Sequence, residues 1–252
     1  MRTVLVHYHI FKNAGSTVDL LLQNTFGQAW RSFEGSNAAS RIKPEELVDF
    51  LVMHPQVKAV SSHHLMFPVP ASPVVEVLPL VFLRHPLDRV RSVYEFERKQ
   101  GQMHGPVSLG AEHAARLSLG DYLRWRFGSA ANGVVHNCQT TFLLGSKQFS
   151  RRQISAGDFD LALQTLCGLR FFGLVEDFDA SVRRLGKLLE DNDIPLSSEY
   201  KAVNVNPHRA GALEGRLADL REEVGETMWA ELLERNAWDM RLYENAVNRL
   251  KQ

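Results

Sequence analysis

The strongest constraint on the fold is a repeated order of apolar strand, short loop and amphipathic helix. Residues 3–10 are rich in β-branched and aromatic side chains, which predicts a buried strand before a glycine-containing loop and a helix start. Apolar runs at 57–62, 78–83 and 169–175 predict three further strands. Because strands that alternate with helices form a mostly parallel sheet, we expect a three-layer α/β fold with helices on both faces. Ligand sites in such folds lie where the carboxyl ends of the strands meet the loops.

Proline positions and helical periodicity predict the elements between these strands. Pro44 and Pro86 suit the first position of a helix, where a missing N–H costs nothing. Further helices are expected at residues 120–127, 136–144, 178–188 and 223–252. Residues 101–120 are rich in Gly and His, and we expect a surface insertion there that borders a substrate cleft.

Length and charge limit the class of protein. We expect a single domain over residues 1–252, because a chain of this length can bury a substantial core. Lys plus Arg equal Asp plus Glu at 29 each, so no overall positive field attracts nucleic acid or an anionic membrane. We therefore expect no nucleic-acid partner and only a local anion site. The apolar run at the N-terminus is too short and too polar for a signal peptide or a membrane span.

Cysteine usage bears on the cellular compartment. Cys138 and Cys167 allow at most one disulfide, which fits a reducing compartment better than a secreted domain stapled by disulfides. We expect both cysteines to be small buried hydrophobic residues. The expected location is the cytoplasm.

The loop after the first strand carries the first candidate site. It consists of Lys12, Asn13, Ala14, Gly15, Ser16 and Thr17. Backbone N–H groups at a helix start, with the helix dipole behind them, form a cradle for an anion. Gly15 would let a phosphate approach closely, Lys12 would add a charge, and the two hydroxyls would be further donors. The lysine precedes the glycine, so this is not a Walker loop, and a plain helix N-cap beside a solvated lysine is the simpler alternative.

A second candidate site follows the predicted strand at 78–83. Arg84 leaves the carboxyl end of that strand, and Ser92 lies two helical turns along the next helix. Both side chains can then face one phosphate, with the guanidinium group supplying two parallel donors. The two sites together would suit a nucleotide with phosphates at two positions.

These two segments resemble the 5′-phosphosulfate loop and the 3′-phosphate motif of the P-loop-like sulfotransferases. The first segment is similar to the first motif of the carbohydrate branch, which has the sequence His-Ile-Pro-Lys-Thr-Ala-Gly-Thr. That branch includes heparan sulfate 2-O-sulfotransferase-like proteins. This chain has Phe11 in place of the proline and Asn13 in place of the threonine, and it keeps the lysine and the glycine. The resemblance implies a P-loop NTPase-like sulfotransferase fold.

Three further segments resemble the family in the required order. Residues 137–145 resemble its Asn-x-Gln-Thr-Arg-x-Leu-x-Gly motif, with Thr141 in place of the arginine. Residues 173–181 resemble its Gly-Leu-x-Glu-x-Phe-x-x-Ser stretch, and residues 236–243 resemble its closing helix. The resemblance therefore covers nearly the whole chain.

The resemblance implies a reaction and roles for named residues. The protein would transfer the sulfuryl group of 3′-phosphoadenosine 5′-phosphosulfate (PAPS) to an acceptor hydroxyl by in-line displacement. Lys12 would stabilise the charge on the departing adenosine 3′,5′-bisphosphate. A Gly-His-aromatic pattern of the family aligns with His64, which would be the general base, with His63 as the alternative. The carbohydrate branch suggests a glycan or glycoconjugate as the acceptor.

Other interpretations of the same residues are open. His7 and His9 face the same side of the first strand, and we expect structural roles and no metal because no carboxylate or cysteine pattern accompanies them. A non-catalytic nucleotide-binding protein would keep the cradle without turnover. An atypical small-molecule kinase would need a magnesium-binding carboxylate after a strand, and the sequence shows no obvious one.

Overall fold

The computed structural model describes residues 1–37, 39–104, 108–128, 132–145, 154–190, 194, 196–197 and 211–251. The chain divides into two compact units, each made of two separate stretches. The sheet unit comprises Met1–Leu83 and Gln139–Val205, and the helical unit comprises Arg84–Cys138 and Asn206–Gln252. The expectation of a single domain stays a prediction.

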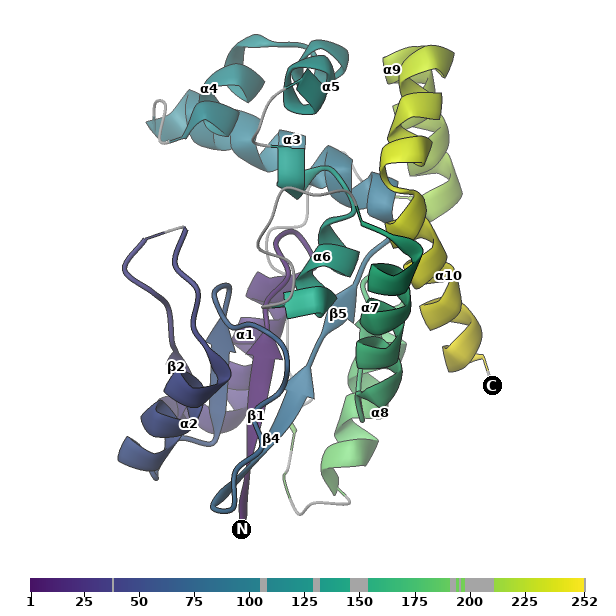
Figure 1. Ribbon diagram of the computed structural model, residues 1–252. Helices are drawn as coiled ribbons and strands as arrows, with labels where there is room; N and C mark the ends of the chain where they lie inside the picture. Colours follow the sequence, from purple (N-terminus) through teal and green to yellow (C-terminus); the bar gives the residue numbers. More distant parts are fainter. Residues whose placement is uncertain are drawn as a thin grey trace. The chain divides into compact units, whose positions relative to one another are not determined.

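The sheet unit is built on parallel strands (Figure 1). Its main sheet has the order β2-β3-β1-β4, and every neighbouring pair is parallel. These strands are β1 (Arg2–Tyr8), β2 (Trp30–Ser32), β3 (Ala59–Ser62) and β4 (Val75–Leu80). A second parallel pair joins β5 (Phe82–Leu83) to β6 (Gly173–Leu174). Because β2, β3 and β1 are neighbours, the loops that leave their carboxyl ends lie side by side.

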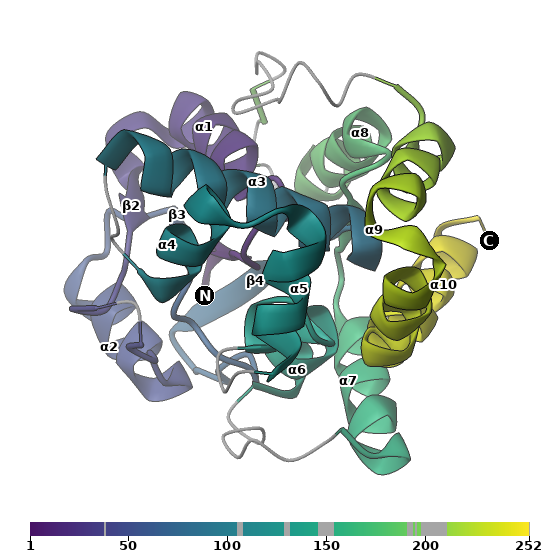
Figure 2. The same cartoon turned by 90° about the horizontal axis from the view of Figure 1, so that it is seen from above.

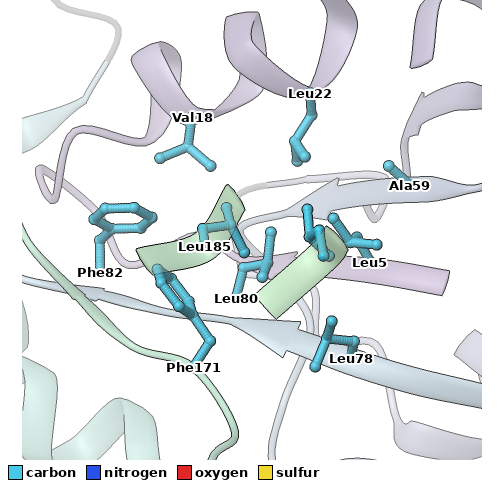
Figure 3. Packing of buried hydrophobic residues seen from close by; sticks show 10 residues of the cluster. Leu5, Val18, Leu22, Ala59, Leu78, Leu80, Phe82, Phe171 and Leu185 are labelled. Atoms are coloured by element: carbon cyan, nitrogen blue, oxygen red, sulfur yellow. The ribbon is translucent and has the colours of Figure 1, made fainter. Parts of the chain in front are cut away.

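Helices flank this parallel sheet, so the predicted α/β architecture is confirmed. They are α1 (Gly15–Phe26), α2 (Pro44–Met53), α6 (Cys138–Leu144), α7 (Ala156–Gly168) and α8 (Phe178–Glu190). A hydrophobic core lies on the face of the sheet that α1 and α8 cover (Figure 3). The ten buried members of this core are Leu5, Val18, Leu22, Ala59, Leu78, Leu80, Phe82, Phe171, Leu185 and Leu189. Removal of this apolar surface from water is the main force that holds the helices on the sheet.

The opposite face of the sheet carries aromatic packing near the end of β1. The buried ring of Tyr8 stacks on Phe67, with 4.6 Å between ring centroids. Phe67 in turn meets Phe142 of α6 edge-on at 6.1 Å. Since successive strand residues point to opposite faces, His7 lies on the α1 side of β1 while Tyr8 lies on this one.

The helical unit contains α3 (Pro86–His104), α4 (Leu109–Arg116), α5 (Leu119–Gly128), α9 (Leu213–Arg235) and α10 (Ala237–Leu250). Helices α4 and α5 pack beside α3 (Figure 2), and α9 also contacts α3. A buried ion pair joins α5 to α3, with Nη2 of Arg126 lying 2.6 Å from Oε1 of Glu97. The hydroxyl of Tyr122 donates to the same carboxylate at 2.6 Å, so the buried carboxylate of Glu97 has a second hydrogen-bond donor. Among the described residues, no helix combines the length and the hydrophobicity that a membrane span requires.

Several predicted boundaries need correction. The predicted strand at 78–83 is divided, because β4 ends at Leu80 beside β1 and β5 then pairs with β6. The predicted insertion at 101–120 is mostly helical where it is described, as the end of α3, all of α4 and the start of α5, and residues 105–107 lie outside the described ranges. The predicted closing helix is two helices that meet at Asn236. Both cysteines are free, and Cys167 is exposed rather than buried.

Candidate functional site

The loop between β1 and α1 turns through left-handed backbone conformations. Lys12 and Ala14 have φ angles of 67° and 60°, which non-glycine residues rarely adopt. The buried side chain of Asn13 holds this turn in place, because its Nδ2 donates to the Phe82 carbonyl at 2.7 Å and to Oε1 of Gln139 at 2.8 Å. The turn is thereby tied to β5 and α6, whose contacts offset the cost of its conformation.

The turn presents backbone N–H groups at the start of α1. The N–H of Thr17 donates to the Ala14 carbonyl at 2.9 Å. Within the part of the chain that the structure describes, no group accepts a hydrogen bond from the N–H of Ala14, Gly15 or Ser16. These groups lie at the positive end of the helix dipole, which favours an anion such as phosphate. The backbone therefore offers donors at the position where the sequence predicts an anion cradle.

Gly15 is required by a side chain of the protein itself. A Cβ atom at this position would lie 1.6 Å from Nε2 of His9, so every other residue type would clash with the imidazole ring. His9 is buried just after the end of β1. The sequence suggests that Gly15 makes room for a phosphate, whereas the structure shows that the ring of His9 lies against it.

Two further imidazole rings and a carboxylate lie next to His9, on the side of β3 and β2. The ring centroids of His9 and His63 lie 3.7 Å apart. Nδ1 of His63 lies 3.0 Å from Oε1 of Glu34, and Nδ1 of His64 lies 2.9 Å from Oε2 of the same carboxylate. We call Glu34, His63 and His64 the carboxylate–imidazole cluster. It follows from the strand order, because Glu34 comes after β2, the two histidines after β3 and His9 after β1.

Glu34 was not among the site residues predicted from the sequence. The backbone N–H of His63 donates to its Oε1 at 3.0 Å, and the hydroxyl of Ser62 donates to its Oε2 at 3.1 Å. These bonds hold the carboxylate at the carboxyl end of β3. In the sequence, Glu34 is one acidic residue in a polar stretch, which is also the usual appearance of a solvated surface residue.

The cluster combines an ionised carboxylate with a neutral imidazole. Partial burial would raise the pKa of Glu34, but its hydrogen bonds and electrostatic interaction with His63 and its hydrogen bond with Ser62 together lower the pKa below its usual value. Burial lowers the pKa of His63, and the neighbouring His9 lowers it further. At neutral pH, Glu34 is therefore charged and His63 is in the form that accepts a proton.

The two predicted bases differ in accessibility. Nδ1 of His64 also accepts a hydrogen bond from the N–H of Gly35 at 2.9 Å, and this side chain is 12% exposed. The side chain of His63 is 43% exposed and contacts His9 beside the turn. The sequence pattern favours His64 as the base, and the geometry favours His63.

A second group of ionisable side chains lies on the α1 side of β1. Nδ1 of His7 lies 2.9 Å from Oδ1 of Asp19, and Nδ1 of His9 lies 3.6 Å from Oδ2. Among the residues that the structure describes, these three form the group whose ligand atoms could hold a metal ion. Burial would raise the pKa of Asp19, but the neighbouring side chains of His7, His9 and Ser61 together hold it well below its usual range. The sequence predicted structural roles for both histidines and did not single out Asp19.

The residues predicted to bind a 3′-phosphate lie in the helical unit. Arg84 donates from Nε and Nη2 to Oδ2 of Asp88, at 2.8 and 2.7 Å. Nε of Arg216 donates to Oδ1 of the same carboxylate at 3.0 Å. Burial beside these charged side chains lowers the pKa of the adjacent His85 to about 4. Ser92 is buried in α3, and Arg84 precedes that helix, so the helical unit contains both predicted residues and the sheet unit contains the predicted cradle.

Two other family-like segments make architectural contacts. Oδ1 of Asn137 accepts hydrogen bonds from the N–H groups of Trp238 and Asp239, each at 3.0 Å, and so caps α10. The hydroxyl of Ser181 accepts a hydrogen bond from the N–H of Leu174 at 2.9 Å, which joins α8 to β6. These motif residues hold elements together within each unit.

Comparison with known proteins relates the whole chain to an archaeal protein. The chain is 28% identical over 254 residues to an uncharacterized protein from Archaeoglobus fulgidus, and the similarity covers 100% of this chain and 98% of that protein. No family model matches the chain. The similarity spans both units.

Replacing Gly15 with alanine should displace the ring of His9. Because the new Cβ would overlap the imidazole, Gly15→Ala should lower the free energy of unfolding by about 1–3 kcal/mol. Urea unfolding followed by circular dichroism measures this loss. In a His9→Ala background the same substitution should cost much less, because the clashing ring is absent.

Gly186→Ala is the matched control for this prediction. Gly186 lies inside α8, and a Cβ there would meet Leu196 at 3.9 Å, an ordinary contact. This control should raise stability by about 0.5–1 kcal/mol through helix propensity. Equal losses for Gly15→Ala with and without His9 would contradict the proposed contact.

Proposed function

We propose that the protein is a PAPS-dependent sulfotransferase that modifies a hydroxyl of a carbohydrate or glycoconjugate. The observation that carries the proposal is that the turn at residues 12–17, with its backbone donors and its lysine, lies against the ring of His9, which in turn contacts the imidazole of His63. Transfer of a charged group to a hydroxyl needs both an anion cradle and a base. The resemblance of five ordered segments to sulfotransferases adds the identity of the donor.

In this proposal the turn binds the 5′-phosphosulfate of the donor. The N–H groups of residues 14–16 donate to its oxygens, and Lys12 supplies a positive charge at the same end. The resemblance assigns the 3′-phosphate to Arg84 and Ser92. Asn13 acts by holding the turn, through its bonds to β5 and α6.

The transfer step is an in-line displacement at sulfur. The acceptor oxygen forms a bond to sulfur while the bond from sulfur to the bridging oxygen breaks, and adenosine 3′,5′-bisphosphate leaves. Lys12 stabilises the negative charge that develops on the bridging oxygen. The acceptor proton passes to Nε2 of His63, whose Nδ1 is held by the Glu34 carboxylate. We prefer His63 to His64 because it is more exposed and lies against His9 at the turn.

Calorimetric titration should show that the protein prefers adenosine 3′,5′-bisphosphate to ATP. We expect binding at least about 10-fold tighter for the bisphosphate, which is roughly 1.4 kcal/mol. Lys12→Ala and Arg84→Ala should each weaken this binding, because each removes a charged donor. His113→Ala is the control, since this residue stacks on Trp125 elsewhere in the helical unit. A preference for ATP would favour an atypical small-molecule kinase and contradict the proposal.

Removal of the base should lower turnover without preventing nucleotide binding. With radiolabelled PAPS and a panel of glycan acceptors, Lys12→Ala and His63→Ala should each reduce the rate by roughly 10²-fold or more. His64→Ala should have a smaller effect, and the opposite order would assign the base to His64. Nucleotide binding with no transfer to any acceptor would favour a non-catalytic nucleotide-binding protein.

The role of Glu34 in positioning His63 can be tested separately through the pH–rate profile. The Glu34 carboxylate raises the pKa of His63, although burial has the larger, opposite effect. Glu34→Gln should therefore lower this pKa and move the acid limb of the pH–rate profile to lower pH. A loss of rate with an unchanged profile would indicate that Glu34 has only a structural role.

A further inference from the structure

We propose that His7, His9 and Asp19 form a binding site for a divalent transition-metal ion of the zinc type. His7 is in β1 and His9 follows it two residues later on the same side, while Asp19 projects from the first turns of α1. The proposed sulfuryl transfer uses none of these residues as a ligand. The inference therefore concerns a second property of the sheet unit and is tested without nucleotide.

The distances between the three side chains suit a shared ion. Nδ1 of His7 lies 2.9 Å from Oδ1 of Asp19, and Nδ1 of His9 lies 3.6 Å from Oδ2. The ligand atoms of the group all lie within 4.8 Å of one another. Atoms bound to one zinc ion at about 2.0–2.2 Å are separated by roughly 3–3.5 Å, so small side-chain rotations would complete the coordination.

Nδ1 of His9, which faces Asp19, has no hydrogen-bond partner among the described residues. Its side chain is 9% exposed, and Nδ1 lies 3.6 Å from Oδ2 of Asp19, beyond hydrogen-bonding distance. A buried polar atom without a partner costs free energy. A metal ion between Nδ1 and the carboxylate would supply the missing interaction.

The chemistry of the donor set selects the ion. Two imidazole nitrogens and one carboxylate suit zinc and related transition ions, whereas magnesium and calcium prefer ligands that are all oxygen. The two histidines are buried, but the side chain of Asp19 is 23% exposed, so one side of the group is reached by solvent. That side gives an ion a path of entry and a position for water as a further ligand.

Equilibrium dialysis of the chelator-treated protein against Zn²⁺ tests the site directly. We expect one bound Zn²⁺ per chain, and Co²⁺ bound in its place should give the visible absorption of a protein-ligated ion. Asp19→Asn and His9→Gln should each weaken Zn²⁺ binding by roughly 10- to 100-fold or more. Melting curves followed by circular dichroism establish that each variant is folded. Because the two substitutions lie in different elements, one variant still tests the site if the other fails to fold.

His63→Gln is the matched control, because it removes a neighbouring histidine that contacts His9 but lies outside the proposed ligand set. It should bind Zn²⁺ as the original chain does. The proposal is overturned if the original chain takes up no stoichiometric Zn²⁺, or if folded Asp19→Asn binds it unchanged. Loss of binding in His63→Gln alone would place the ion at the carboxylate–imidazole cluster and would also overturn it.

Discussion

The imidazole of His9 packed against Gly15 is the contact on which the rest of the site depends. Because no Cβ fits beneath the ring, the first residue of α1 must be glycine. The same ring lies against His63, and its Nδ1 faces Asp19. One side chain therefore borders the backbone donors of the turn and the proposed base, and it is itself one of the proposed metal ligands. A change at His9 should consequently disturb all three, whereas a change at Glu34 or Asp19 should disturb one.

The order of the parallel strands explains why residues distant in sequence meet at this ring. Strands β2, β3 and β1 are neighbours, and their carboxyl ends emerge at the same edge of the sheet. Glu34, His63 and His9 each follow one of these three strands. A parallel sheet with this order brings such residues together without any special loop, which is the usual origin of sites in α/β proteins.

The parts of the fold that rest on local patterns were predictable from the sequence. The strand before residues 12–17, the helix after it and the helices that begin at Pro44 and Pro86 all appear, because apolar periodicity and proline geometry act over a few residues. The short strand β2 and the residue Glu34 after it were not predicted. A three-residue strand gains its place from pairing with β3, which no local pattern records. Asp19 was missed for a related reason, since only the packing of α1 against β1 brings it to His7.

The meaning of a predicted motif also depended on tertiary contacts. The sequence predicts that Gly15 makes room for a phosphate, and in the structure the ring of His9 lies against it. Asn137 and Ser181 belong to segments chosen by resemblance, and in the structure they cap α10 and join α8 to β6. A motif therefore indicates that a residue matters, and the contacts decide whether it matters for binding or for architecture.

The central claim is that the turn before α1 binds the charged end of a nucleotide through its backbone. Amide hydrogen exchange of Ala14, Gly15 and Ser16, measured by NMR with and without saturating adenosine 3′,5′-bisphosphate, tests this most directly. We expect exchange at these three amides to slow when the nucleotide is present, because their N–H groups then donate to phosphate oxygens. Unchanged exchange at all three, under conditions where calorimetry shows that the nucleotide is bound, would contradict the claim.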